Sequence, residues 1–260
     1  MQANYNPDRL FLITNDDDVT AKGIRVLANV AAQWGRVVVV APDRPQSAMG
    51  HAITINQPLR ITKLDVFGNN IEAYACSGTP VDCVKLAVDK ILPQKPNFCL
   101  SGINHGSNYS VNVIYSGTMS AAMEAAMEHI PAIGFSILDY APDADLSAAE
   151  VWVHRILGLA LNNGMPPCNL LNVNIPKLPL DEIKGYKICR QAYARWEEDF
   201  IMRQDPTGNK YYWLTGKFIN LEPKATDTDV FALENGYLSV VPVQYDLTAY
   251  NDIHYLNEQW

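Results

Sequence analysis

The chain has 260 residues, of which 48% are hydrophobic and 18% are charged. This composition is typical of globular proteins and excludes a disordered chain, a fibrous repeat and a disulfide-stabilised miniprotein. The formal net charge of −8 opposes binding of a nucleic-acid polymer, and no cluster of lysine and arginine reverses it. No apolar run approaches the ~20 residues that a membrane-spanning helix needs. We therefore expect neither a nucleic-acid polymer nor a membrane as a partner.

The amino-terminal segment and the cysteines both indicate a cytoplasmic protein. Residues 1–11 are polar and lack a basic region followed by an apolar stretch, so we expect no signal peptide. The five cysteines are odd in number and form no C-x-x-C pair, which favours buried free thiols in a reducing compartment. They are Cys76, Cys83, Cys99, Cys168 and Cys189.

The first part of the chain alternates apolar runs with amphipathic segments. Residues 10–14 predict a buried strand, residues 21–35 a helix that ends at a glycine, and residues 36–42 a second buried strand. Strand, helix and strand in so short a stretch predict a βαβ unit with parallel strands. The alternation continues to about residue 180, which predicts an open α/β sheet covered on both faces. The later helices are expected at 81–92, 117–130 and 148–164, and the later strands at 97–104, 132–138 and 169–176.

After about residue 185 the pattern changes to two extended, aromatic-rich arms. They flank the turn sequence at 205–209, where a proline is followed by a glycine, and predict a long β-hairpin over 190–217. A hairpin of this length needs a surface to lie on, either its own domain or another subunit, and both alternatives stay open. The arms carry Tyr193, Trp196, Phe200, Tyr211, Tyr212 and Trp213. A strand and a short helix are expected after residue 236.

Three carboxylates follow the first predicted strand, where an open parallel sheet binds its ligands. Asp16, Asp17 and Asp18 repel one another unless protons or a cation compensate their charge. One aspartate is enough to cap the following helix, and capping alone is the alternative interpretation. Carboxylate, hydroxyl and amide oxygens suit Mg²⁺ or Mn²⁺ rather than zinc. We therefore predict a hard divalent cation at this loop.

A second polar group opens the long helix expected at 117–130. The free N–H groups of a helix start, together with the hydroxyls of Ser116 and Thr118, form a natural cradle for phosphate, although ordinary capping explains the same residues. His105 lies in a loop rich in glycine and asparagine, where it is a candidate general acid or base. A solvated loop histidine is the favoured interpretation for His105, and the same holds for His51.

Several motifs together resemble the SurE family (survival protein E) of metal-dependent 5′-nucleotidases. The motifs are NDD at 15–17, APDR-x-x-S at 41–47, GTP-x-DCV at 78–84, SGIN-x-G at 101–106 and YSGT at 115–118. The resemblance runs from residue 10 to the C-terminus. It implies a Rossmann-like, doubly wound, mostly parallel sheet with a projecting hairpin and a C-terminal exchange segment. It divides the chain into a catalytic core (1–185), a hairpin or oligomerisation region (186–235) and a swapped C-terminal strand and helix (236–260) in a homodimer or homotetramer.

The resemblance also implies an activity and the residues that perform it. The activity is hydrolysis of nucleoside monophosphates, or of other small phosphomonoesters, with one Mg²⁺ or Mn²⁺ per subunit. The implied metal ligands are Asp16, Asp17, Ser47 and Asn104. Asp16 and Asp17 are the expected catalytic residues, with Asp16 as the first choice for base or nucleophile. The implied phosphate-binding residues are Asn15, Asn108, Ser116, Gly117 and Thr118.

The chain departs from the family pattern at three places. Asp18 stands where the family usually has glycine, Val111-Asn112 where it has an acidic pair, and Tyr250 where it has histidine. Two alternative functions also stay open. Residues 16–20 fit the D-x-D-x-T pattern of a haloacid-dehalogenase-type aspartyl phosphatase, and the same fold also suits a non-enzymatic phosphate- or nucleotide-binding module.

Overall fold

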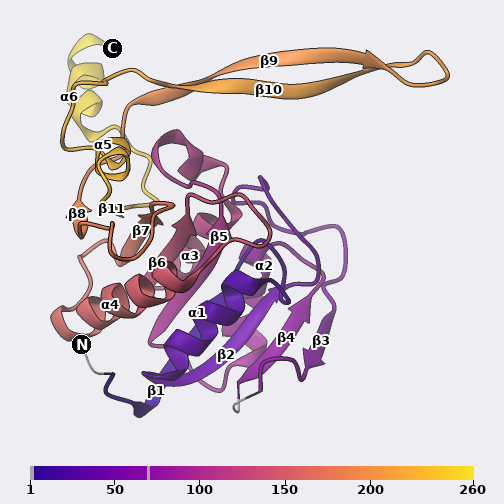
Figure 1. Ribbon diagram of the computed structural model, residues 1–260, viewed down its shortest axis with the longest axis vertical. Helices are drawn as coiled ribbons and strands as arrows, with labels where there is room; N and C mark the ends of the chain where they lie inside the picture. The colour runs from indigo at the N-terminus through magenta and orange to yellow at the C-terminus, as the bar shows by residue number, and fades with distance from the viewer. Residues whose placement is uncertain (1–2, 69–70) are drawn as a thin grey trace.

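A nine-stranded sheet forms the centre of the protein in the computed structural model, which describes residues 3–68 and 71–260 (Figure 1). Its strand order is β3-β4-β2-β1-β5-β6-β7-β11-β8. The parallel strands are β1 (Asn6–Thr14), β2 (Gly35–Pro42), β4 (Glu72–Cys76), β5 (Phe98–His105), β6 (Ala132–Ile137) and β7 (Leu170–Ile175). Antiparallel pairing adds β3 (Ile61–Leu64) to β4 and β11 (Leu238–Pro242) to β7, while β8 (Tyr186–Ile188) runs parallel to β11. The predicted doubly wound, mostly parallel α/β sheet is confirmed.

Helices cover both faces of this sheet, so its central strands are apolar on both sides. On one face α1 (Lys22–Ala32) and α4 (Ser147–Asn163) pack on Phe11, Ile13 and Leu100. On the other face α2 (Pro80–Leu86) and α3 (Gly117–Met127) pack on Leu12 and Val40. All five of these strand side chains are completely buried. Continuous apolar runs in the strands, rather than alternating ones, follow from this double burial.

Some elements differ from their predicted bounds. The first strand begins at Asn6 rather than at residue 10, and the helix expected over 81–92 divides into α2 and a π-helical turn, Ala87–Ile91. Helix α2 begins at Pro80 because Thr79 caps it and exchanges hydrogen bonds with Asp82 in a capping box. The short strands β4 and β8 and the helix α5 (Asp229–Glu234) carry no apolar periodicity long enough to predict them.

The predicted hairpin is confirmed and projects away from the sheet as a separate two-stranded ribbon (Figure 1). Strands β9 (Ala194–Gln204) and β10 (Lys210–Asn220) pair along their whole length. At the turn Asp205 Oδ1 accepts the backbone N–H groups of Thr207 and Asn209, both at 2.9 Å. The distal arms do not pack on their own domain, because Phe200 is 61% exposed and Trp213 is 63% exposed. This exposure argues against the first alternative, packing of the arms on their own domain.

The C-terminal segment also lies outside the core. After β11 the chain leads to α6 (Tyr250–Gln259), none of whose described side chains is buried. Tyr250 donates a short hydrogen bond to Asp246, so it closes a local turn rather than entering the sheet edge where the polar loops lie.

Four of the cysteines are buried and all are free thiols, as predicted. Among the described residues, no helix has the length and apolarity needed to cross a membrane.

Candidate active site

The strand order reverses between β1 and β5, and the predicted site residues gather at the carboxyl ends of these strands. A crevice at such a reversal is the usual ligand site of an open α/β sheet. A cleft of about 560 Å³ opens here. The predicted residues Asp16, Ser47, Asn104 and Asn108 line it, although they come from loops after β1, β2 and β5.

Asp16 lies deepest in this site, pressed against the first turn of α3. Its side chain is 4% exposed, and the Thr118 hydroxyl donates a short hydrogen bond to its Oδ1. Burial raises the pKa of Asp16 to about 6, although the hydrogen bonds from Thr118 oppose the rise. A Cβ atom on Gly117 would lie 2.8 Å from Asp16 Cβ and 2.9 Å from Oδ2. Glycine at position 117 therefore allows the helix start to approach this carboxylate.

Two buried oxygens next to Asp16 have no hydrogen-bond partner within residues 3–68 and 71–260. They are Asn15 Oδ1 and Asp17 Oδ2. Burial raises the pKa of Asp17, and the neighbouring His105 opposes the rise. A buried oxygen without a partner costs free energy, about 1–3 kcal/mol even for a neutral group, so two of them on the residues that flank Asp16 indicate a ligand that these oxygens can bind.

Asp18 differs from its two acidic neighbours, because its side chain closes a turn. Its Oδ1 accepts the backbone N–H of Thr20 at 2.6 Å and the Thr20 hydroxyl at 2.7 Å. Its backbone φ is 114°, a left-handed conformation that glycine adopts readily and other residues adopt at a cost. Asp18 therefore occupies a backbone position suited to the family's glycine, with its carboxylate engaged by Thr20.

The loop that carries Ser47 is attached directly to the Asp16 loop. The Gln46 backbone N–H donates to the Asp16 carbonyl at 2.7 Å. Farther along, two buried carboxylates hold the loop: Glu124 bonds His51 Nε2 at 2.8 Å, and Asp82 accepts the Thr54 backbone N–H at 3.0 Å. Asp82 belongs to the GTP-x-DCV motif, so this motif anchors the Ser47 loop. His51 has a structural role here and does not line the cleft.

The predicted phosphate-binding residues are held rigidly around α3 and the loop after β5. Asn108 is buried, its backbone N–H donates to Asn174 Oδ1, and its side-chain amide donates to Ser136 Oγ, both at 2.8 Å. Ser116 caps α3, because its Oγ accepts the Met119 N–H at 3.0 Å. The hydroxyls of Ser116 and Thr118 are thus engaged with the helix start and with Asp16. The positive end of the α3 dipole favours an anion at this helix start.

The cleft also contains residues that were not among the predicted metal and phosphate ligands. Tyr115, Tyr140 and Trp196 line it, and His105 joins them beside Asp17 with Nδ1 buried and without a partner among the described residues. His105 follows Asn104 directly, which is a local signal for its position. No local signal links Trp196, on the hairpin, to a loop more than 80 residues earlier in the chain.

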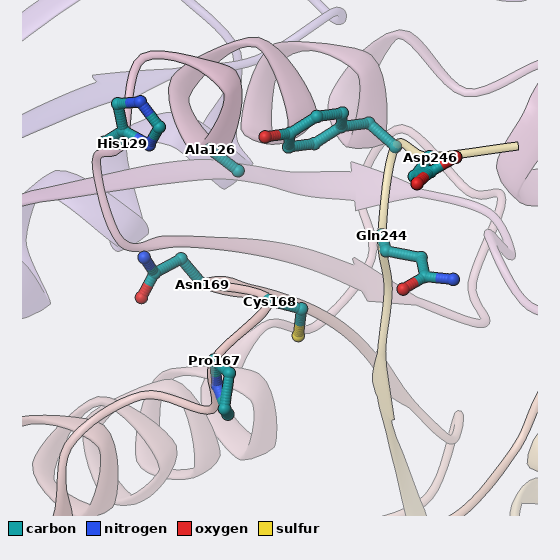
Figure 2. Close-up of a pocket in the computed structure, with 8 residues that line it drawn as sticks. Ala126, His129, Pro167, Cys168, Asn169, Gln244 and Asp246 are labelled. Atoms are coloured by element: carbon teal, nitrogen blue, oxygen red, sulfur yellow. The ribbon is translucent and has the colours of Figure 1, made fainter.

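A second cavity, of about 400 Å³, lies at the opposite edge of the sheet (Figure 2). The C-terminal segment crosses it near the end of α3 and the start of β7, where it is lined by His129, Cys168 and Asp246. Figure 2 shows His129 and Asp246 at opposite ends of the cavity, so these groups do not converge. The cavity at the carboxyl edge is therefore the candidate active site.

Comparison with known proteins agrees with the motifs. The family model for survival protein SurE matches residues 11–198. The chain belongs to the SurE family. It is 58% identical to the 5′-nucleotidase SurE of Flavobacterium psychrophilum over 95% of this chain and 96% of that protein. It is 59% identical to the 5′-nucleotidase SurE of Flavobacterium johnsoniae over 95% of each chain. The crystal structure of the SurE protein from Aquifex aeolicus superimposes with a TM-score of 0.82 at 38% identity, covering 96% of this chain and 99% of that one.

These matches confirm the family that the motifs predicted. The relatives' names agree with the predicted activity, and the haloacid-dehalogenase alternative gains no support from them. The geometry at residues 16–20 agrees with this outcome, because Asp18 and Thr20, the second aspartate and the threonine of the D-x-D-x-T pattern, are hydrogen-bonded to each other.

Proposed function

We propose that this protein is a 5′-nucleotidase, a divalent-cation-dependent phosphomonoesterase that converts nucleoside monophosphates to nucleoside and phosphate. The observation that carries the proposal is the set of buried oxygens at the strand reversal. Asp16 and Asp17 both have raised pKa values near the N-terminus of α3, and Asp17 Oδ2 and the neighbouring Asn15 Oδ1 are buried without partners among the described residues. Perturbed carboxylates in a cleft are typical of a functional site.

Asp16, Asp17, Ser47 and Asn104 are the proposed ligands of one Mg²⁺ or Mn²⁺ ion. Asn104 donates its amide N–H to the Gly106 carbonyl at 2.9 Å, which orients its carbonyl oxygen as the ligand atom. No cluster of three or more His, Cys, Asp and Glu residues able to hold a metal occurs in the described part of the chain. The donors are therefore two carboxylates with neutral oxygens, a set that fits a hard cation. When bound, the cation offsets phosphate charge and activates the phosphorus for attack.

The phosphate is held from the other side by the start of α3 and by two asparagines. The positive end of the helix dipole, at Gly117, favours an anion. Ser116 contributes as the cap of this helix start rather than as a free hydroxyl. The amides of Asn15 and Asn108 complete the proposed cradle, and the fixed Asn108 backbone lowers the entropic cost of binding.

Asp16 is the proposed base. In the cation-free chain burial raises the pKa of Asp16 to about 6, and a cation bound at the same carboxylate opposes that rise. Thr118 occupies Oδ1, so Oδ2, which faces the side-chain-free Gly117, is the oxygen available for the proton. A water molecule attacks the phosphorus in line and gives one proton to Asp16, the P–O bond to the nucleoside breaks on the opposite side, and the leaving ester oxygen takes a proton from solvent water to become the nucleoside hydroxyl. Direct attack by an Asp16 oxygen is the alternative route.

The proposed assembly is a homodimer or homotetramer in the cytoplasm. The catalytic core would be residues 1–185, the hairpin region 186–235 would join subunits, and the C-terminal segment 236–260 would be exchanged between them. Exposed aromatic side chains on the hairpin arms and the unburied α6 support this division, because exposed apolar patches of this kind mark interfaces. The free thiols support a reducing compartment.

The test is a turnover assay on protein stripped with EDTA. A panel of nucleoside monophosphates is supplied with Mg²⁺, Mn²⁺, Ca²⁺ or no metal, and phosphate release is measured. The proposal expects release that depends on Mg²⁺ or Mn²⁺. Tight binding of nucleotide without release under any metal would instead favour the binding-module alternative.

A further inference from the structure

The cleft has a second wall that the metal and phosphate residues do not use. It extends from Asp16 along the hairpin, where Trp196, Leu214 and Gly216 line it. Clefts of about 300–1,000 Å³ typically enclose a whole small molecule. The phosphate occupies only the end of the cleft near Asp16. The end near the hairpin combines the aromatic Trp196 and the apolar Leu214 with the polar Glu198 and Thr215, a lining that suits the organic part of the substrate.

Trp196 is the largest aromatic side chain of this wall, and it is held in place. Its Nε1–H donates to Asn112 Oδ1 at 2.8 Å. Its ring contacts Phe218 of the paired strand edge-on, with 5.9 Å between ring centroids, and Phe218 contacts Tyr109 at 5.3 Å. Trp196 is nevertheless 39% exposed. A large aromatic ring that is fixed at its edges and open on the cleft side is suited to stacking a planar group.

Asn112 connects this ring to the loop after β5. Besides accepting the Trp196 N–H, its amide donates to Ser107 Oγ at 3.1 Å. Position 112 is one of the departures from the family pattern, where an acidic residue is common. A carboxylate could accept from both the indole and the Ser107 hydroxyl, whereas the amide accepts from the indole and donates to Ser107. The amide is therefore the group that joins the hairpin to the Asn104–Asn108 loop in this chain.

The base of the hairpin is fixed to the same region by Asp229. This buried carboxylate accepts the Ser110 N–H at 2.7 Å and the Ala192 N–H at 2.9 Å. Ser110 lies two residues before Asn112, and Ala192 lies four residues before Trp196. Both partners of the indole hydrogen bond are thus positioned by one side chain, and the Trp196 wall is preorganised before substrate binds.

We propose that the base of the nucleoside stacks on Trp196, and that this contact selects nucleoside monophosphates over phosphate esters of small aliphatic alcohols. Asn112 is a positioning residue that keeps the ring in the stacking orientation. The inference rests on the proposed function, since it names where the substrate of that reaction is recognised. Stacking on an aromatic ring accepts every base, so broad base tolerance with discrimination against aliphatic esters follows.

The test compares adenosine 5′-monophosphate with glycerol 2-phosphate in three variants. Trp196→Ala is expected to raise KM for adenosine 5′-monophosphate about tenfold and to leave kcat/KM for glycerol 2-phosphate within about twofold. Trp213→Ala, which removes the same side chain from the distal arm, is expected to change neither. Asn112→Ala is expected to lose part of the selectivity, and Asn112→Asp, which keeps an acceptor for the indole, is expected to retain more of it. Equal loss on both substrates in Trp196→Ala, or no change in KM, would overturn the proposal.

A second measurement separates this inference from the proposed function. Saturation-transfer NMR with adenosine, which has no phosphate to hydrolyse, reports binding in the cleft whether or not turnover occurs. Adenosine binding that is present in the wild type and in Trp213→Ala but lost in Trp196→Ala supports the stacking wall even in a protein without phosphatase activity. Adenosine binding that is unchanged in Trp196→Ala overturns it even in an active nucleotidase.

Discussion

The carboxyl edge of the sheet and the distal arms of the hairpin both depart from the usual pattern of buried apolar and exposed polar side chains, but in opposite directions. At the edge, polar groups are buried, and Asn15 Oδ1 and Asp17 Oδ2 have no partner among the described residues. On the arms, large apolar groups such as Phe200 and Trp213 are exposed. A small ion or a polar ligand can supply the contact that a buried oxygen without a hydrogen bond lacks, whereas another protein surface can cover an exposed aromatic surface. The two regions therefore indicate two different kinds of partner.

The base of the hairpin lies between these extremes. Trp196 is partly exposed but is held by a hydrogen bond and an edge-on ring contact, unlike Trp213 at the distal end. The same ribbon thus contributes a fixed wall to the cleft and a free surface beyond it. Changes at the carboxyl edge should affect chemistry and leave the assembly unchanged, and changes on the distal arms should do the reverse.

The largest effect is expected for Asp17→Asn. Removing a charged metal ligand should lower kcat/KM at least about 100-fold, because even indirect supports of metal ligands cost 10–100-fold. Unfolding temperature and oligomer mass should stay near the wild type, since the amide has the same shape. Asp65→Asn, an exposed carboxylate after β3, is the matched control and should keep full activity. Wild-type kcat in metal-stripped Asp17→Asn would exclude the metal assignment.

Shortening the distal arms should change the assembly without abolishing the chemistry. Replacing residues 201–213 by Asn-Gly joins Phe200 to its cross-strand partner Leu214 with a two-residue turn and leaves Trp196 in place. Light scattering should show a lower oligomer mass, and turnover of glycerol 2-phosphate should persist. An unchanged mass would mean that the arms do not hold the assembly.

Asp82→Ala should loosen the loop that carries Ser47. The change removes the hydrogen bonds to Thr54 and the reciprocal bond with Thr79, for an expected loss of about 3 kcal/mol in unfolding free energy. The metal concentration at half-maximal activity should also rise, because Ser47 is less well placed. Asp89→Ala, an exposed neighbour, should change the unfolding free energy by less than about 0.5 kcal/mol. A stable Asp82→Ala protein with wild-type metal dependence would contradict this anchoring role.

Asp18 should tune the metal site without being a ligand. Its negative charge lies close to Asp16 and Asp17, so Asp18→Gly should require several-fold more Mg²⁺ or Mn²⁺ and reach wild-type kcat at saturation. Asp18→Asn keeps an acceptor for Thr20 and removes only the charge, and it should show the same shift. High salt should reduce the difference from wild type. Complete loss of turnover in Asp18→Gly at high metal would make Asp18 a ligand.

The smallest expected effect is a loss of folding stability at acid pH, and it arises at the base of the hairpin. Hydrogen bonds from Arg190 hold the pKa of Glu222 at about 2, below its ordinary value of 4.5. A lowered carboxyl pKa stabilises the folded state above pH 4.5, and this contribution is lost as the pH falls toward 2. Urea unfolding should therefore show a stability difference between wild type and Arg190→Ala that shrinks from pH 7 to about pH 3. A difference independent of pH would contradict this assignment.

The sheet and most of the site were predictable because their signals are local. Apolar runs located β1 and β5, and parallel topology alone brings Asp16, Ser47 and Asn104 to one edge. The short strand β4 alternates polar and small residues over five positions, too few to show a period.

The contacts of Trp196 were not predictable from the sequence. Its partner Asn112 lies 84 positions away, and their meeting depends on the path of the hairpin and on its Asp229 anchor. The engagement of the Ser116 and Thr118 hydroxyls within the chain also needed the structure, because a cap and a phosphate ligand have the same sequence signal.

The central claim is that Asp16, Asp17, Ser47 and Asn104 at the carboxyl edge bind one hard divalent cation per chain. Isothermal titration of Mn²⁺ into EDTA-stripped wild type and Asp17→Asn tests it without relying on turnover. We predict one ion bound per chain in the wild type and at least about tenfold weaker binding in Asp17→Asn. No binding to the wild type, or equal affinity in both proteins, would contradict the account.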